Sequence, residues 1–224
     1  MTAEKYNKLP DYKKKTAFTL AEVLITLGII GVVAAMTIPN LMTAFAKHRV
    51  ETQLVKFYST MNQAMRMSVA DNGTPEGWVV SGKTYTYDEN VEFLETYISP
   101  YLKHSGYNDC TGNSRQVCME LFNGGLLVVG IDSNGGDFMY FIDGDNSNIT
   151  GRNYFVFQFS KVSGVDSTYN SQNFLEPYVY GWDGTEEGLR NHSRYGCRKG
   201  HVGNFCAKRI QRNSWRIPSS DYPW

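Results

Sequence analysis

The chain has 224 residues, with 22 basic and 22 acidic side chains and a formal net charge of +0. This balance argues against a protein whose main partner is nucleic acid, because such proteins carry an excess of Lys and Arg. Residues 72–224 are long enough for one domain with its own core, and no internal repeat or low-complexity linker divides them.

An apolar stretch covers residues 18–46, and its only charged side chain is Glu22. About 20 apolar residues are enough to cross a bilayer as a helix, so the stretch is long enough to span a membrane. A cleavable secretory signal has a shorter apolar core of about 7–15 residues. Placing a carboxylate in a membrane helix costs on the order of a few kcal/mol. Glu22 therefore requires a partner that compensates its negative charge.

The helical pattern continues beyond the apolar stretch. The apolar residues that recur at helical spacing and form one face of an amphipathic helix are Val50, Leu54, Phe57, Met61 and Ala64. The sequence Asp-Asn-Gly at 71–73 is the stop signal, because Gly suits the left-handed position after a helix end. We therefore predict one helix over residues 18–71, with a membrane half and an amphipathic half.

The start of this helix carries a family resemblance. The sequence TA/FTLAEVLITLGIIGVVAAMTIPNL at 16–41 resembles the processing site and N-terminal helix of type IV prepilins and type II secretion pseudopilins. The resemblance implies that a prepilin peptidase removes residues 1–17 by cutting between Ala17 and Phe18, and that the new Phe18 amine is methylated. Pro39 then matches the helix-bending proline of the family. Ala17 departs from the family pattern, which usually has Gly there.

The resemblance also implies a role for Glu22 in assembly. A cut before Phe18 creates a free amine four residues from Glu22, so the carboxylate of one subunit would meet the terminal amine of its neighbour in a filament. Removing one partner of a buried ion pair costs about 3–5 kcal/mol. The alternative is a Glu that is protonated, or lies at the headgroup level of a plain single-pass anchor. Because Pro39 has no amide hydrogen, we expect a bend or a melted turn near Thr37–Asn40.

Charge predicts the orientation of the chain in the inner membrane. Residues 1–17 carry Lys5, Lys8 and the triplet at 13–15 against Glu4 and Asp11. The positive-inside rule keeps such a leader in the cytoplasm. The chain is thus expected to be a single-pass protein whose head, residues 72–224, is periplasmic or extracellular, and which lies in a filament after assembly.

Within the head the pattern predicts an α+β fold. Alternation at Thr84–Tyr87 indicates a short strand, and Asp88 then caps a helix. The apolar face of that helix is Val91, Leu94, Ile98, Tyr101 and Leu102, with Pro100 in its last turns. Strands are predicted at Val117–Phe122, Leu126–Ile131, Phe138–Ile142 and Tyr154–Phe159. Short turn sequences join them into an antiparallel sheet that packs on the amphipathic half of the long helix, as in a type IV pilin.

The cysteines all lie in the predicted outward domain. Cys110 and Cys118 are spaced C-x7-C, and Cys197 and Cys206 are spaced C-x8-C, neither of which is a zinc-ribbon spacing. An oxidising compartment favours disulfides. Of the possible connectivities we favour the two local pairs, Cys110–Cys118 and Cys197–Cys206, and free thiols are the alternative.

Signals for an enzyme or a cofactor are weak. Residues 77–84 match the phosphate-loop pattern G-x4-G-K-[ST], but no buried strand precedes them and no helix follows directly. Residues 143–148 resemble the start of a calcium loop, but Tyr154 stands where the closing Glu belongs. The histidines fall in no metal-ligand spacing. We predict no enzyme activity, no cofactor and no metal.

The C-terminal part is locally basic. Its cations are Arg190, Arg194, Arg198, Lys199, Lys208, Arg209, Arg212 and Arg216, with Tyr195, Phe205 and Trp215 among them. This composition is found on nucleic-acid surfaces. Because the whole chain is neutral, an intersubunit contact or a solvated surface is the favoured interpretation over DNA binding.

The resemblance implies a pilin-like structural subunit of a type II secretion pseudopilus or a related type IV filament. Its implied partners are other pilin or pseudopilin subunits, the prepilin peptidase, an inner-membrane platform protein and an assembly ATPase. The alternatives are an adhesive or motility pilin, a DNA-uptake pseudopilin that uses the basic C-terminal stretch, and a single-pass membrane enzyme.

Overall fold

The structure is a computed structural model of the chain. It describes residues 18–78, 86–110, 116–132, 135–144, 151–160, 174–219 and 221–224. The chain divides into two compact units, residues 1–45 and residues 46–224. The long helix α1, Leu20–Asn72, runs through this division. Its first part is therefore described with the first unit, and its second part with residues 46–224, which we call the head unit.

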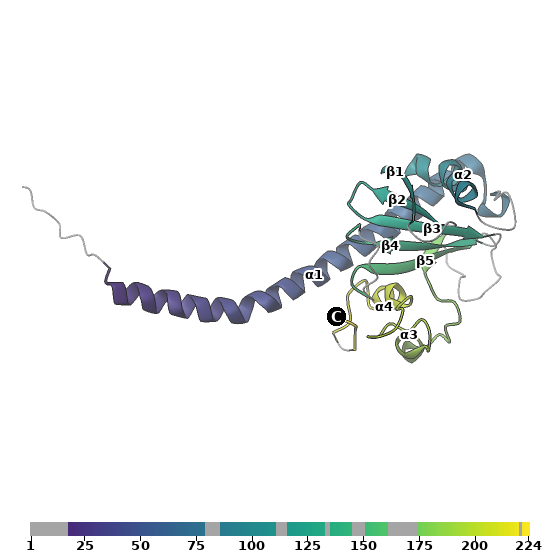
Figure 1. Cartoon of the computed structure of the whole chain (residues 1–224). Helices are drawn as coiled ribbons and strands as arrows, with labels where there is room; N and C mark the ends of the chain where they lie inside the picture. The colour runs from purple at the N-terminus through teal and green to yellow at the C-terminus, as the bar shows by residue number, and fades with distance from the viewer. Residues whose placement is uncertain are drawn as a thin grey trace, which may run out of the picture. The chain divides into compact units, whose positions relative to one another are not determined.

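In the first unit α1 is an uninterrupted helix (Figure 1). Pro39 lies inside it, and the residues on both sides are helical, so of the bend or melted turn expected near Thr37–Asn40 the structure excludes the melted turn. Threonines on both sides of Pro39 bond to carbonyls of this helix. The Thr37 hydroxyl donates to the Val33 carbonyl at 2.9 Å, and the Thr43 hydroxyl donates to the Pro39 carbonyl at 3.0 Å. Such bonds from Ser and Thr to the preceding turn occur within continuous helices and often bend them.

In the head unit, α1 buries the face that the apolar spacing predicted. The residues on this face that are almost inaccessible are Val50, Leu54, Phe57, Met61 and Ala64. The helix ends where the sequence indicated. Gly73 adopts a φ of 76°, and its amide donates to the Val69 carbonyl at 3.0 Å. This left-handed glycine gives the chain a sharp exit from the helix.

A six-stranded antiparallel sheet with sequential order β1–β6 forms the centre of the head unit (Figure 1). Its strands are β1 His104–Asp109, β2 Val117–Leu121, β3 Leu126–Asp132, β4 Gly135–Phe141, β5 Tyr154–Ser160 and β6 Leu175–Pro177. The predicted strands correspond to β2–β5, and the antiparallel connection between them is confirmed. The edge strands β1 and β6 were not predicted. The α+β fold, with a long N-terminal helix followed by an antiparallel sheet, is that of a type IV pilin.

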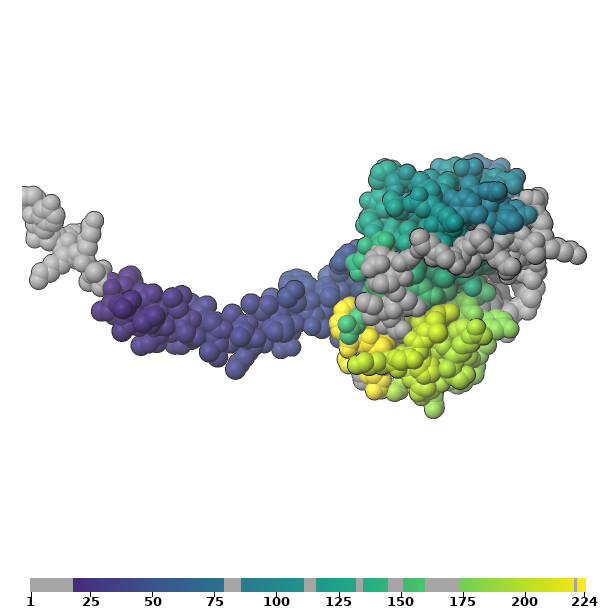
Figure 2. All heavy atoms as spheres, viewed as in Figure 1, coloured from purple at the N-terminus to yellow at the C-terminus, as the bar shows by residue number. Residues whose placement is uncertain are grey.

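Both faces of the sheet are buried. One face packs on α1, where the Phe57 ring stacks on the Tyr140 ring with centroids 4.1 Å apart. The other face contributes Val128 and Val156 to a second cluster with Leu189 and Phe205. That cluster includes residues near α3 Glu186–Asn191 and α4 Cys206–Arg212. Figure 2 shows the residues after 175, in yellow-green, gathered on one side of the head unit. The C-terminal part is thus a second layer of the fold.

The first short helix of the head unit corrects one prediction. The helix α2 is Tyr87–Tyr97, between the 3-10 turns η1 Pro75–Gly77 and η2 Ser99–Tyr101. Its N-cap is Thr86, not Asp88. The Thr86 hydroxyl accepts from the Glu89 amide at 3.3 Å, and the Glu89 carboxylate accepts from the Thr86 amide at 2.9 Å. This capping box makes Tyr87 the first helical residue. The prediction of a strand at 84–87 is therefore wrong at Thr86 and Tyr87. Residues 84 and 85 lie outside the described residues.

Candidate functional site

The first turn of α1 places the predicted assembly residue Glu22 in a capping box with Thr19. The Thr19 amide and the Thr19 hydroxyl both donate to Glu22 Oε2, each at 2.9 Å. The Glu22 amide donates in return to the Thr19 hydroxyl at 3.2 Å. The sequence Thr-Leu-Ala-Glu at 19–22 is the signature of such a box, and sequence analysis missed it. The carboxylate thus has a partner within its own chain, and it satisfies the Thr19 amide, which water would otherwise have to bind.

The apolar side chains of the first unit are exposed. Phe18 is 86% exposed, and Ile25 and Ile30, which lie further along the helix, are more than half exposed. The hydroxyl of Thr26 donates to the Val23 carbonyl at 2.9 Å, and the hydroxyls of Thr37 and Thr43 likewise donate to carbonyls of their own helix. Because these threonine hydroxyls are satisfied within the helix, they suit an apolar environment. Among the described residues, α1 is the one helix long and apolar enough to cross a membrane.

The structure brings the other predicted residues of the N-terminal segment into this single helix. Phe18 is the first described residue, and the other side of the cleavage site, Ala17, lies outside the described residues. Pro39 lies within the helix. A Cβ atom added at Gly28 or Gly31 would meet nothing within 4 Å, so the fold of the single chain does not require glycine at either position. Small residues at such places allow another helix to approach closely.

The head unit contains two disulfides. Cys110, directly after β1, is joined to Cys118 in β2, with the Cα atoms 5.3 Å apart. Cys197 is joined to Cys206, the first residue of α4, with the Cα atoms 4.7 Å apart. These are the local pairs that the sequence favours, and no cysteine of the described residues is free. Each disulfide lies in one of the two buried clusters, so both act on the core of the head unit.

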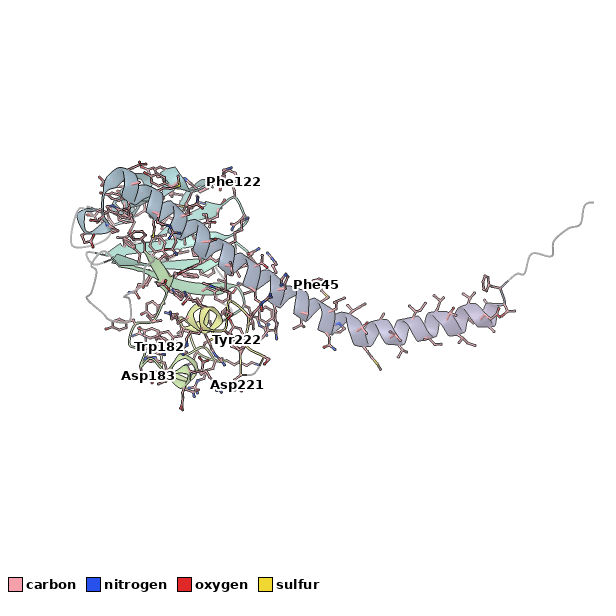
Figure 3. The ribbon with its side chains drawn as sticks, turned by 180° about the vertical axis from the view of Figure 1, so that it is seen from behind. Phe45, Phe122, Trp182, Asp183, Asp221 and Tyr222 are labelled. Atoms are coloured by element: carbon pink, nitrogen blue, oxygen red, sulfur yellow. A yellow bond between two sulfur atoms is a disulfide. The ribbon has the colours of Figure 1, made fainter. Side chains whose placement is uncertain are left out.

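Much of the basic C-terminal stretch is paired within the chain. Arg209 is 4% exposed and binds Glu186 at 3.2 Å, while its Nη1 donates to the Asp221 carbonyl at 2.8 Å. Arg190 binds the Asp221 carboxylate, and Asp221 is labelled beside Tyr222 in Figure 3. Arg216 binds Glu51 of α1 at 2.7 Å. The sequence did not indicate these pairs. They reduce the cationic surface that a nucleic acid would contact.

The weaker signals of the sequence do not assemble into a site among the described residues. Gly77 ends a 3-10 turn and Trp78 is buried, and the rest of the phosphate-loop pattern lies outside the described residues. In the calcium-like segment, Asp143 binds Arg49 at 2.7 Å, and residues 145–148 lie outside the description. No group of three or more His, Cys, Asp or Glu within the described part could hold a metal ion.

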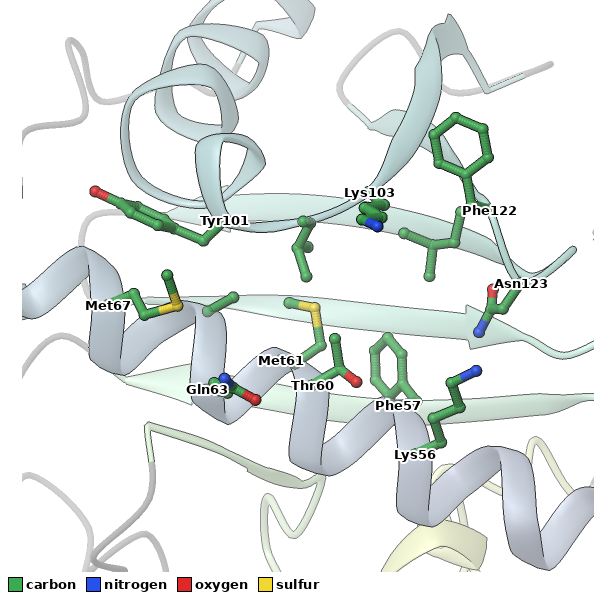
Figure 4. A pocket seen from close by; sticks show the side chains of 13 residues that line it. Lys56, Phe57, Thr60, Met61, Gln63, Met67, Tyr101, Lys103, Phe122 and Asn123 are labelled. Atoms are coloured by element: carbon green, nitrogen blue, oxygen red, sulfur yellow. The ribbon is translucent and has the colours of Figure 1, made fainter.

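A groove of about 420 Å³ runs beside α1 in the head unit (Figure 4). Its lining residues include Lys56, Phe57, Met61, Met67, Tyr101, Lys103 and Phe122. The side chain of Phe122 at its rim is 72% exposed. The polar groups on the groove wall are lysines, amides and hydroxyls. This set contains no carboxylate or imidazole that could serve as a general base next to a nucleophile.

Comparison with family models gives two matches. Residues 12–38 match the prokaryotic N-terminal methylation motif, which is the cleavage and methylation signal of type IV prepilins. Residues 40–224 match a family of unknown function, DUF6613. Searches of curated proteins and of solved structures found no match. The motif and the apolar helix suit a single-pass membrane anchor. The pilin type of protein, to which this motif and fold point, is structural and not enzymatic. The chain therefore belongs to the DUF6613 family and is a type IV pilin-like protein.

Proposed function

We propose that the chain is a structural subunit of a type II secretion pseudopilus or a related type IV filament. The observation that carries the proposal is the position of the methylation motif, which matches residues 12–38 and overlaps the exposed apolar part of α1. A helix with that motif is first a membrane anchor and then a contact surface between subunits. In this proposal the chain acts by polymerising into a filament. A platform protein in the inner membrane and an ATPase in the cytoplasm drive the extension of that filament.

The topology follows from the same segment. Residues 1–17 lie in the cytoplasm, residues 18–45 cross the inner membrane, and the head unit lies outside. Prepilin peptidase cuts between Ala17 and Phe18, and the Phe18 amine is then methylated. The disulfides Cys110–Cys118 and Cys197–Cys206 support an outward position of the head unit, because disulfides persist in oxidising compartments.

Glu22 is proposed to join neighbouring subunits. Both hydrogen bonds from Thr19 go to Oε2 of Glu22, so Oε1 is oriented for a donor outside the capping box. The methylated Phe18 amine of a neighbour is a cationic donor for that oxygen. In an apolar bundle each charge alone would be costly, so the pair specifies the register in which subunits join.

A secretion role is tested by deleting the gene in its native host. The expected result is that folded cargo stays in the periplasm while long surface fibres and transformation are unchanged. Complementation with the wild-type gene should restore secretion, and complementation with Glu22→Gln should not. Loss of surface fibres with secretion intact would instead indicate an adhesive or motility pilin. Loss of transformation alone would indicate a DNA-uptake pseudopilin.

A further inference from the structure

Cationic and aromatic side chains gather where α1 enters the head unit. We define the exit patch as Lys47, Arg152 and Trp224. The Trp224 ring has Lys47 Nζ 5.7 Å and the Arg152 guanidinium 5.5 Å from its centroid. The C-terminal residues, in yellow, thus lie beside the first residues of α1 in the head unit (Figure 2). The patch combines parts that are far apart in the sequence.

Two further arginines of the head unit are paired with acids. Glu51 is bound by the Arg216 guanidinium at 2.7 Å and by the Ile217 amide at 2.8 Å. Asp143 is bound by Arg49 at 2.7 Å. Both arginines remain open to solvent, since 58% of the Arg49 side chain and 64% of the Arg216 side chain are exposed.

The two cations of the exit patch both lie over an aromatic ring. Lys47 and Arg152 both approach Trp224, and the Arg152 residue is exposed. Trp224 is partly buried, and a Trp flanked by Lys or Arg is the composition found where membrane proteins meet the headgroup layer. The patch is therefore suited to a surface that is apolar on one side and anionic on the other.

Helix length places this patch relative to a membrane. A helix rises about 1.5 Å per residue, so residues 18–45 extend about 42 Å. A bilayer with its headgroups is about 40–45 Å thick. When Phe18 lies at the inner headgroup layer, Lys47 therefore reaches the outer one. This follows from the continuity of the chain alone, because residue 46 begins the head unit directly after the apolar segment.

We propose that the exit patch binds the phosphate groups of phospholipids in the outer leaflet of the membrane that the same chain spans. Guanidinium and ammonium groups recognise phosphate through charge-assisted hydrogen bonds. The Trp224 ring lies among the glycerol and headgroup atoms. The head unit is thereby held on the bilayer before it enters a filament. The proposal rests on the proposed membrane anchor and adds a second contact with the same membrane.

The test uses the full chain in vesicles of phosphatidylethanolamine and phosphatidylglycerol that contain a headgroup spin-labelled phospholipid. The spin label quenches tryptophan fluorescence in the headgroup layer. Trp224→Phe should lose most of the label-dependent quenching. The matched control is Trp182→Phe, which should keep the wild-type quenching. In the wild-type chain the Trp182 indole donates to the Thr185 carbonyl and contacts Arg212. Replacing phosphatidylglycerol by a neutral lipid should weaken the quenching.

A charge variant separates the patch from the anchor. Lys47→Gln with Arg152→Gln should reduce the quenching, whereas the exposed pair Arg198→Gln with Lys199→Gln should leave it unchanged.

Flotation of the vesicles reports the anchor independently. If the chain floats but Trp224→Phe quenches like the wild type, the patch proposal is overturned and the anchor stands. If the chain does not float, the anchor is overturned and the patch with it. Quenching that depends on crosslinked dimers would make the patch a contact between copies and would also overturn the proposal.

Discussion

Asn62 of α1 binds both backbone groups of Leu175 in the edge strand β6. Its Nδ2 donates to the Leu175 carbonyl at 3.0 Å, and its Oδ1 accepts from the Leu175 amide at 2.9 Å. The side-chain amide thus occupies the place of a seventh strand and closes the edge of the sheet. Because Asn62 is 1% exposed, no water replaces these bonds when they are broken.

Asn62→Ala should therefore lower the free energy of unfolding by about 2–4 kcal/mol, because it leaves two buried backbone groups without partners. Gln63→Ala, at an exposed position of the same helix, is the control and should change it by less than about 0.5 kcal/mol. Urea unfolding of the full chain in detergent micelles measures both. Equal midpoints for the two variants would contradict this role of Asn62.

The processing site predicts a mature protein that begins at Phe18 with a methylated amine. Mass mapping of the N-terminus in a strain with active prepilin peptidase checks this. Ala17→Gly should increase the processed fraction, because it restores the family residue before the cut. Intact Met1, or a cut at another bond, in the peptidase-positive strain would show that the predicted site is not used.

The capping box allows the charge of Glu22 to be separated from its role at the helix end. Glu22→Gln keeps an acceptor for the Thr19 amide but removes the charge, so it should insert in the membrane and fail to join filaments. Thr19→Ala removes the cap and keeps the charge, so it should still join them. Subunits in sheared, crosslinked filaments are counted for each. Incorporation of Glu22→Gln at the level of the wild type would leave the ion pair without support.

Each disulfide should contribute about 2–4 kcal/mol to the stability of the head unit through constraint of the unfolded chain. Double Cys→Ser variants at Cys110 with Cys118, and at Cys197 with Cys206, should both lower the urea midpoint. Thiol titration of the non-reduced wild-type chain is the control and should find no free thiol. Four titratable thiols in the non-reduced protein taken from the cell surface would contradict the presence of the two disulfides.

Stability should fall at alkaline pH because of buried tyrosines. Burial raises the pKa of Tyr154 from 10.0 to about 12, with the Asp137 charge as a smaller cause. The stabilising effect is full below the unfolded pKa of 10.0 and is lost as the pH rises through about 12, because the unfolded chain ionises first. Tyr154→Phe should therefore reduce the loss of urea midpoint between pH 9 and about 11. Tyr180→Phe, at a 58% exposed position, should not.

Sequence patterns predicted the elements whose side chains repeat regularly. The buried face of α1 from Val50 to Ala64 and the strands β2–β5 follow from apolar spacing and turn residues. The edge strands did not, because β1 is half exposed and β6 has three residues. The Thr-Tyr alternation at 84–87 suggested a strand, but the capping box of Thr86 with Glu89 decides the local structure.

The sequence indicated which residues belong to the candidate site, but not the contacts that they make. The motif indicated Phe18, Glu22 and Pro39, but the bond between Thr19 and Glu22 required a signature that was overlooked. The pairing of Arg216 with Glu51 joins residues 165 positions apart, and no local pattern carries such information. The C-terminal arginines therefore looked like one continuous cationic surface, although Arg209 is buried and Arg190 and Arg216 are each paired with an acid.

The bonds of Glu51 have a consequence for the order in which the protein is made. Glu51 Oε1 accepts from the amide of Ile217, and Oε2 is bound by Arg216, so the first turns of α1 in the head unit depend on residues synthesised much later. Long-range contacts of this kind form late in folding, because a long loop must close first. In the proposed function, the membrane helix is therefore available to the prepilin peptidase while the head unit is still incomplete. Processing at Phe18 would then precede the completion of the fold.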